Sequence, residues 1–355
     1  MPDGDASTTV VTLPLLQPPP RPPARLRAWS TTRADWALEL WLILCVLSVA
    51  LLFTLDELLN GNDVWGPLPA DFDPETAHHW CERIVPERLV RSPANGYSSL
   101  AFVFAAWGVV SIGLVYQPRA ARNHLRYFVP FTVLQAVILF FGGVGALLAH
   151  AHAGPVDAWP LLLDYASVWP LVAMPALLFA VRFIPLETTR SKERRWVYWV
   201  ILVAFLALLI ALVLPVILGQ HNQWVDDYLY TAVPVMAFML PSLLVARLVV
   251  EALGWLPPSS AGPALIVLSL TFSVVAYLLQ DPDRVGVCSP ASSWFLNTHL
   301  WWHVLQSISL FLVWYWCFFE DVADAAFVEA RKERLAQRGP RLRLLPDIPR
   351  LFLEP

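Results

Sequence analysis

The sequence predicts an all-α protein whose helices cross a membrane. Hydrophobic residues make up 57% of its 355 positions and charged residues only 15%, which is too apolar for a soluble domain. Uncharged stretches recur along the chain, and about 20 apolar residues are enough to cross a bilayer as a helix. The net charge is −4 and no basic patch stands out, so we expect membrane lipids, and no nucleic acid, as partners.

The first part of the chain contains a tail, one membrane helix and a loop. Residues 1–35 are rich in Pro and Arg, as in QPPPRPPARLR at 17–27, and are expected to form a disordered tail. The apolar stretch 36–56 predicts the first transmembrane helix. The longer and more polar segment 57–97 is predicted to be a loop outside the membrane.

Seven further apolar stretches predict a membrane core over residues 98–319, and the charged segment 320–355 predicts a second tail. Polar residues crowd the join between the second and third stretches of this core, which makes their ends the least sharply marked. The seven predicted spans are 98–117, 127–150, 159–181, 196–218, 228–250, 261–280 and 297–319.

The positions of the basic residues predict the orientation. With the N-terminus in the cytosol, 20 of the 24 Lys and Arg residues fall in cytosolic segments, as the positive-inside rule requires. Both termini are therefore expected in the cytosol, and segment 57–97 on the extracytoplasmic side. Only Lys192 and Lys332 are lysines, which is typical of a GC-rich bacterial genome and suggests a bacterial plasma membrane.

Ionisable residues gather at the extracytoplasmic ends of three predicted spans. His150 and His152 lie at the end of one span, Asp164 lies near the start of the next, and His299 and His303 begin the last. Ionisable residues are costly in hydrocarbon unless something satisfies them. Their convergence on one leaflet predicts that these groups share a site.

The histidine spacing favours a metal site. His299 and His303 lie four residues apart, so they share one face of a helix and both can bind one metal ion. Alternatively, both are satisfied by the backbone or by lipid headgroups. His150 and His152 are two residues apart and point to opposite faces, so only one can contribute, and periodicity does not choose between them.

Three histidines and one water around Zn²⁺ form the open site that catalytic zinc uses. In such a site Asp164 would orient a ligand, hold the water or act as a general base. Its alternative role is stabilisation of a helix N-terminus. A site in one leaflet suits an amide or ester bond within a lipid.

Two other features are expected to serve packing. The segment GGVG at 142–145 precedes His150 by about one turn, and small residues let a neighbouring helix approach closely. Trp302 adjoins His303, and its expected role is packing or membership of the aromatic belt at the membrane interface, with lining of a pocket at the histidines as the alternative.

Several segments, in the same order, resemble the alkaline ceramidase family of seven-helix membrane hydrolases. This family is related to the adiponectin and progestin receptors within the CREST superfamily. The similarity runs from about residue 79 to 318. It is carried by HWCE (79–82) with SPANGYSSLAFV (92–103), GVGALLAH (143–150), LLLDY (161–165) and CSPASSWFLNTHLWWH (288–303).

The resemblance implies a zinc site and a reaction. It implies that His150, His299 and His303 bind Zn²⁺, and it selects His150 over His152 through the Gly-x-Gly register. It implies that Asp164 supports the metal-bound water, so that these four residues form the catalytic set. The implied reaction is hydrolysis of the amide bond of a ceramide-like or other N-acyl lipid.

The chain departs from the family pattern at several positions. Span 36–56 has no counterpart in the seven-helix core, and Ala146 replaces a Ser that is expected to contact the metal-bound water. Asp164 also lies two or three residues further from His150 than is usual. The alternative function is therefore a receptor-like, lipid-binding protein that keeps a structural zinc but has weak or no turnover.

The family's calcium site is incomplete here. Glu82 is present, but His79 stands where the family has an Asp, so we do not expect Ca²⁺, which needs several oxygen ligands. Cys81 and Cys288 both fall on the extracytoplasmic side, where a disulfide is expected. A haem or proton-relay protein is disfavoured, because its histidines usually lie near mid-membrane.

Overall fold

A computed structural model confirms the all-α fold. It describes residues 24–62, 64–66, 78–79, 82–116, 123–153, 159–182, 196–218, 242, 245–246, 249, 261–279 and 297–319. The helices and strands are α1 (Ala24–Leu59), β1 (His78–His79), β2 (Glu82–Arg83), α2 (Pro93–Val115), α3 (His124–Tyr127), α4 (Pro130–His152), α5 (Trp159–Val181), α7 (Trp196–Ile217), α9 (Ala261–Leu279) and α10 (Thr298–Phe319). β1 and β2 form one short antiparallel pair.

The chain is a multi-pass membrane protein. Within the described ranges, six helices are long and apolar enough to cross a bilayer, namely part of α1 and all of α2, α4, α5, α7 and α10. The helix α9 provides a shorter apolar segment over Ala264–Leu279. Seven of the eight predicted spans therefore coincide with helices, whereas the predicted span 228–250 lies almost wholly outside the described residues.

The helix boundaries differ most from the prediction at the starts of α1 and α2. The helix α1 begins at Ala24, so the second half of the predicted 1–35 tail includes helix. The helix α2 begins at Pro93 and not at residue 98, because Pro lacks a backbone N–H and fits the first turn of a helix. The predicted loop 57–97 is correspondingly shorter, and the predicted tail 320–355 lies outside the described residues.

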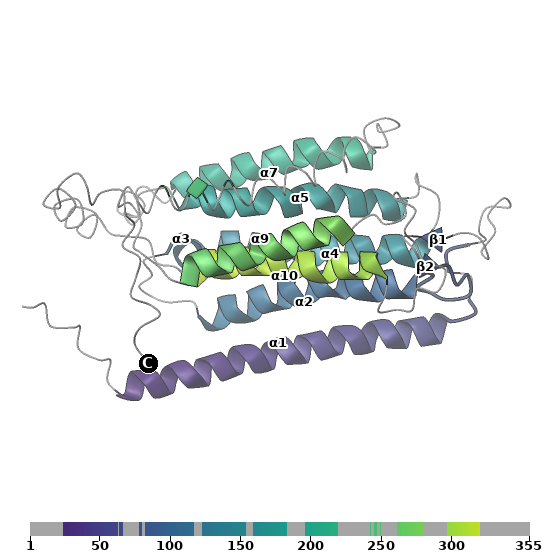
Figure 1. Ribbon diagram of the computed structural model, residues 1–355, viewed down its shortest axis with the longest axis horizontal. Helices are drawn as coiled ribbons and strands as arrows, with labels where there is room; N and C mark the ends of the chain where they lie inside the picture. The colour runs from purple at the N-terminus through teal and green to yellow at the C-terminus, as the bar shows by residue number, and fades with distance from the viewer. Residues whose placement is uncertain are drawn as a thin grey trace, which may run out of the picture.

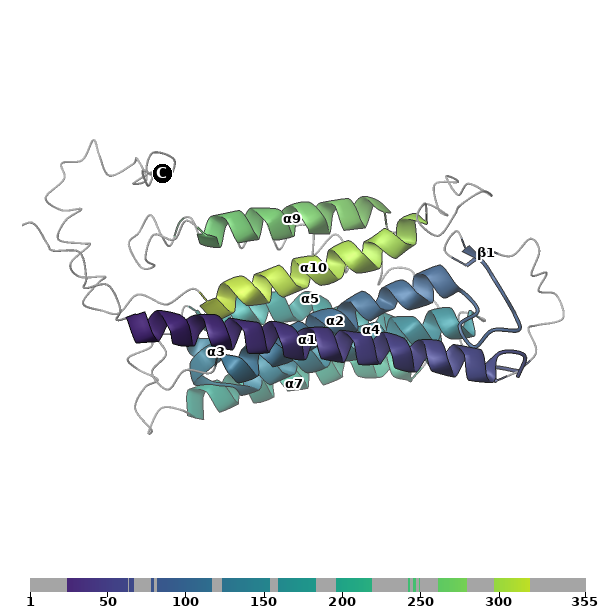
Figure 2. The ribbon, with the colours of Figure 1, turned by 90° about the horizontal axis from the view of Figure 1, so that it is seen from below.

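The helices lie nearly side by side in one bundle (Figure 1). The helix α1 runs along one edge and α7 along the opposite edge, with α2, α4, α5 and α10 between them. Seen from below, α9 lies on the outside of α10 (Figure 2). The strands β1 and β2 sit at the end of the bundle where α1 and α4 end and where α2 begins.

Glycines in α4 let this helix approach two neighbours, as the GGVG segment predicts. A Cβ atom on Gly143 would lie 3.0 Å from both the Ser99 O and the Val103 N atoms of α2. A Cβ atom on Gly145 would lie 3.1 Å from the Leu163 O atom of α5. Both helix backbones are thus held close to α4, which is the central helix of the bundle.

The last turn of α10 is stabilised by polar side chains from two other elements. The Cys317 carbonyl accepts hydrogen bonds from Asn123 Nδ2 at 2.8 Å and from Arg182 Nη1 at 3.2 Å. The Phe318 carbonyl accepts one from Arg126 Nε at 2.8 Å. These carbonyls have no partner within the helix, so the side chains satisfy them and add positive charge where the helix dipole favours it.

The extra helix α1 is tied to α2 by polar contacts within the apolar interface. Trp41 Nε1 donates to the Phe104 carbonyl at 2.8 Å, and Trp107 Nε1 donates to Ser48 Oγ at 2.9 Å. The Trp41 ring also stacks on Phe311 of α10, with 5.7 Å between ring centroids. The helix α1 exposes most of its apolar side chains, and these contacts fix its rotation and its position along α2.

The close approach of α4 and α2 predicts that Gly143→Ala destabilises the bundle. The new methyl group would lie 3.0 Å from backbone atoms of α2, so the backbone there must give way by a few tenths of an ångström. Overpacking of this kind costs about 1–3 kcal/mol, which exceeds the gain of about 1 kcal/mol from better helix propensity. Thermal unfolding in detergent should show a clear drop in stability.

Gly142→Ala is the matched control for this prediction. Its Cβ would meet only the flexible end of the Leu171 side chain, at 2.9 Å. We expect unfolding close to that of the wild type. Equal loss of stability in the two variants would contradict a specific backbone contact at Gly143.

Candidate metal centre

Three histidines converge at one end of the bundle, as the sequence predicts. One ring nitrogen from each of His150, His299 and His303 lies within 4.8 Å of the other two. The ring centroids are 4.7 Å apart for His299 and His303, and 5.1–5.2 Å apart for each of these with His150. All three side chains are at least 95% buried. Imidazoles gathered in this way form a set of ligands that can hold a metal ion.

The spacing of the three nitrogens fits a zinc ion. Nitrogens bound at about 2.0–2.1 Å to one tetrahedral Zn²⁺ lie roughly 3.3 Å from one another. The observed upper limit of 4.8 Å therefore requires movements of at most about 1.5 Å, which side-chain rotations supply. In the described part of the chain, no other group of three His, Cys, Asp or Glu residues comes together in this way.

The first turn of α10 carries two of the three histidines and has its own cap. Asn297 Oδ1 accepts hydrogen bonds from the His299 N atom at 3.0 Å and the Leu300 N atom at 3.3 Å. Asn is a preferred N-cap residue because its side chain satisfies the free N–H groups of the first turn. The cap holds the turn in which the i and i+4 imidazoles share one face.

The end of α4 explains which of its two histidines joins the cluster. His150 points into the bundle, whereas His152 packs edge-on against Trp65 with 5.5 Å between ring centroids. The helix stops directly after His152, where Ala153 adopts a left-handed conformation with φ of 46°. The selection of His150 over His152 agrees with this geometry.

The start of α2 packs on the end of α4. The Ser92 N atom donates to the His150 carbonyl at 3.0 Å, and the Arg91 N atom donates to the Ala151 carbonyl at 3.2 Å. The Arg91 guanidinium donates to the His152 and Gly66 carbonyls at 3.3 Å and 2.6 Å. N–H groups of the two residues directly before α2 thus satisfy free carbonyls at the end of α4. The backbone of His150 is held by these bonds.

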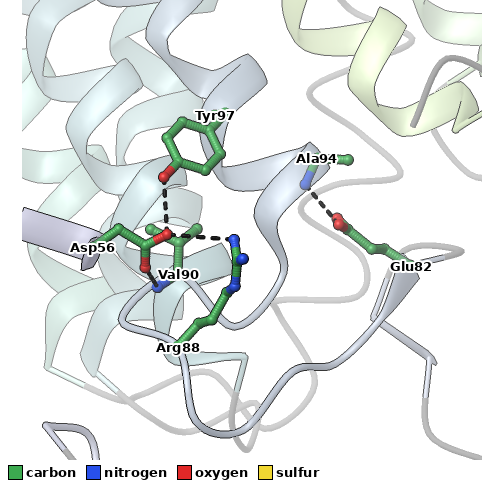
Figure 3. Close-up of polar contacts among 6 residues, drawn as sticks. All are labelled: Asp56, Glu82, Arg88, Val90, Ala94 and Tyr97. Atoms are coloured by element: carbon green, nitrogen blue, oxygen red, sulfur yellow. Dashed lines mark hydrogen bonds and ion pairs between the residues drawn. The ribbon is translucent and has the colours of Figure 1, made fainter. Parts of the chain in front are cut away.

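Glu82 caps the first turn of α2. Its carboxylate accepts hydrogen bonds from Ser92 Oγ at 2.7 Å, Ala94 N at 2.6 Å and Asn95 N at 2.9 Å, and Figure 3 shows the bond to Ala94. Burial raises the pKa of this carboxyl, and the three hydrogen bonds oppose that rise. Glu82, which the family resemblance associates with calcium, therefore serves here as the cap of α2.

A second acidic side chain joins α1 to the same turn. Asp56 is 2% exposed, and it accepts hydrogen bonds from the Val90 N atom at 3.0 Å and from Tyr97 Oη at 2.9 Å (Figure 3). The Arg88 guanidinium lies 3.7 Å from the same carboxylate. The extra helix α1 is thus fixed at its end to the segment that leads into α2.

A small cavity of about 50 Å³ borders two of the three histidines, His299 and His303. That volume holds a few water molecules. Asp164 lies in its wall with His299 and His303, and Ala146 lies there one turn before His150. The remaining lining residues are Phe102, Gly142, Tyr165, Ser167, Val168, Leu171 and Trp302. A carboxylate, imidazoles and space for water therefore meet at one point.

The structure distinguishes among the roles expected for Trp302, which packs in a buried cluster with Val172 and Ala276. Trp302 is only 9% exposed and lines this cavity, so it does not belong to an interfacial belt. Consecutive residues of a helix point in different directions, and the exposed neighbour Trp301 faces outward instead.

One expected feature lies outside the described residues, and some residues that shape the site were not predicted from the sequence. Cys81 and Cys288, the expected disulfide pair, both lie outside the described residues. The role of Asp56 was not predicted, because its partners Val90 and Tyr97 lie 34 and 41 residues away and no spacing pattern links them to it. The cap at Asn297 had a usable signal, since Asn directly before an apolar helix is typical of an N-cap.

No model of a known protein family matches the chain, and neither a curated protein nor a solved structure shows significant similarity to it. The function is therefore inferred from the site itself.

The geometry predicts the pattern of metal loss among histidine variants. Wild-type protein purified in detergent should carry about one zinc per chain by mass spectrometry, because the described residues contain a single cluster of three histidines. His150→Ala and His299→Ala should each remove it, since two ligands hold zinc weakly. Each variant leaves two of the three histidines in place.

His152→Ala is the control for that experiment. His152 packs on Trp65, away from the cluster, so its zinc content should equal that of the wild type. Loss of zinc in His152→Ala with retention in His150→Ala would reverse the assignment.

The contacts of Asp56 predict a cost in stability when it is removed. Asp56→Ala leaves the buried Val90 N–H and the Tyr97 hydroxyl without their acceptor, and each such loss costs about 1–3 kcal/mol. Chemical unfolding followed by Trp fluorescence should show this destabilisation. Asp56→Asn keeps an oxygen for Val90 and should lose less than half as much, and an equal loss would imply that the charge matters more than the hydrogen bonds.

Proposed function

We propose that this chain is a zinc-dependent membrane hydrolase that cleaves the amide bond of a ceramide-like or other N-acyl lipid. The observation that carries the proposal is the cluster of three buried histidines beside a cavity that contains a carboxylate. This set of groups is what metal-assisted hydrolysis requires. The membrane location of the bundle makes a lipid the natural substrate.

His150, His299 and His303 would hold the metal. A zinc ion with three imidazole ligands polarises a carbonyl group and lowers the pKa of a bound water towards about 7. The metal site lies against the cavity, so a water and a substrate carbonyl share the same space. The buried surroundings exclude bulk water, which strengthens electrostatic interactions at the site.

Asp164 is the base in this proposal. Its place in the cavity wall lets it accept a proton from the attacking water. As the new C–O bond forms and the amide C–N bond breaks, the same carboxyl group passes the proton to the departing amine. The products are a fatty acid and a free amine, so atoms and charge balance without any co-reactant.

The cavity also sets a requirement on substrate binding. A volume of about 50 Å³ admits water but not an acyl chain. Part of its lining is apolar, including Phe102, Val168 and Leu171. The side chains around these residues must therefore move apart to admit a lipid chain along that lining.

Membership of the alkaline ceramidase family is part of the proposal. The support is that His150, His299 and His303 meet where the resemblance expects zinc ligands, and that Ala146 faces the cavity where the family has a Ser. The proposed topology has both termini in the cytosol and the metal centre on the extracytoplasmic side, which follows from the Lys and Arg distribution.

The alternative function is a receptor-like lipid-binding protein with a structural zinc. Ala146 is the observation that favours it. A Ser at this cavity position would offer a hydrogen-bond donor to the reaction, and loss of one such donor costs about 2.7–4 kcal/mol in catalysis. Turnover on N-acyl lipids distinguishes the two functions.

The proposal predicts that Asp164→Asn removes hydrolysis but keeps the metal. The amide cannot accept the proton, so release of fatty acid from a panel of N-acyl lipids should fall by about 100-fold or more. Zinc content should stay at that of the wild type, since the three histidines are intact. Chromatography with mass spectrometry measures the product, and undiminished turnover would remove Asp164 from the mechanism.

Ala146→Ser tests the departure from the family pattern. The added hydroxyl points into the cavity beside Asp164 and is expected to raise turnover by about 10-fold or more. Ala149→Ser, on the same helix but not among the cavity-lining residues, is the matched control. Zinc-loaded wild type and Ala146→Ser that both lack turnover on the whole panel would favour the lipid-binding alternative.

A further inference from the structure

The third ligand, His303, has a hydrogen-bonding partner from another helix. Ser98 Oγ lies 2.9 Å from His303 Nδ1, and Ser99 Oγ lies 3.4 Å from the same nitrogen. Both hydroxyls come from the second turn of α2, 205 and 204 residues away in sequence. His303 and both serines are buried, so these contacts exclude water.

The direction of these hydrogen bonds is set by a carbonyl group. Ser98 Oγ and Ser99 Oγ each lie 2.9 Å from the Asn95 carbonyl, which can only accept a hydrogen bond. A hydroxyl carries one proton, so each Ser that donates it to the Asn95 carbonyl has no proton left to donate elsewhere. The Asn95 carbonyl also accepts a hydrogen bond from the His303 ring, so Nδ1–H is the donor on this side of the imidazole and Ser98 Oγ accepts from it.

We propose that Ser98 is a positioning residue that keeps His303 in the tautomer protonated at Nδ1. The opposite tautomer would leave Nδ1 as an acceptor, and Ser98 would have to give up its bond to Asn95 to serve it. With Nδ1 protonated, all the bonds are made and Nε2 keeps its lone pair. A bare Nε2 is the form of imidazole that binds a metal ion.

The rest of this turn fixes Ser98 in place. Glu82 accepts a hydrogen bond from the Asn95 N atom at 2.9 Å, which holds the peptide that takes the Ser98 proton. Tyr97, the neighbour of Ser98, donates to Asp56 of α1. The carboxylates of Glu82 and Asp56, which lie outside the histidine cluster, therefore help to hold Ser98 against His303. Outer partners of metal ligands commonly change metal affinity by 10–100-fold.

The tautomer can be read without any metal. The chain contains eight histidines, few enough for ¹⁵N-histidine NMR of the metal-free protein in detergent micelles. His303 is assigned by the resonances that disappear in His303→Ala. In the wild type we expect its Nδ1 to be protonated and Nε2 bare, and in Ser98→Ala we expect a mixture of the two tautomers.

Metal affinity gives the second readout, and this part rests on the proposed metal site. Competition with a chelator should show that Ser98→Ala binds zinc 10–100-fold more weakly, with one zinc per chain still bound at saturation. Ser98→Thr keeps the hydroxyl and should restore both the tautomer and the affinity. Ser98→Cys, in which sulfur is a poor acceptor, serves as a second loss variant should Ser98→Ala not fold.

Ser99→Ala is the matched control, since it removes the same group one residue away at a contact of 3.4 Å. Its effects on tautomer and affinity should be much smaller. Unchanged tautomer and affinity in Ser98→Ala, or equal effects in Ser99→Ala, would overturn the proposal. A wild type with the expected tautomer but no zinc binding would refute the metal site and leave the role of Ser98 intact.

Discussion

The meeting of two helix ends is the interaction on which the site depends. The helix α4 ends at His152 with carbonyl groups that have no partner in the helix, and α2 begins beside it with free N–H groups. The Ser92 and Arg91 N–H groups donate to the His150 and Ala151 carbonyls. Inside an apolar bundle no water is available to hydrogen-bond these groups, so the N–H groups at one helix end bond to the carbonyl groups at the other. The junction fixes His150 beside the start of α2, and Ser98 of α2 in turn contacts His303 of α10.

The helix that carries two of the three clustered histidines is fixed at both of its ends. Asn297 caps its first turn, and Asn123, Arg126 and Arg182 satisfy the carbonyls of its last turn. Between these ends α10 packs against α2, α5 and α9. Such a helix cannot slide or rotate easily, which keeps His299 and His303 aimed at His150. The polar groups far from the cluster thus matter to its geometry.

Much of the fold could be predicted from hydropathy, because each membrane helix must satisfy its own backbone and so appears as a long apolar stretch. The convergence of His150, His299, His303 and Asp164 followed from counting helix directions. The choice of His150 by periodicity alone was not possible, since it depends on where α4 ends and on the packing of His152 against Trp65. Ser98 was missed because its partner lies 205 residues away and a serine in an apolar helix has no distinctive spacing.

The origin of the ligands has a consequence for biosynthesis. One histidine is supplied by α4 and two by the last described helix, so a nascent chain that has not yet inserted α10 holds a single ligand. The hydrogen bond between Asp56 and Tyr97, by contrast, can form as soon as the next 41 residues have been synthesised. The N-terminal helix can therefore become anchored early, whereas the histidine cluster forms only after α10 has been synthesised and inserted. Bound metal would then mark completed assembly and distinguish finished molecules from truncated ones.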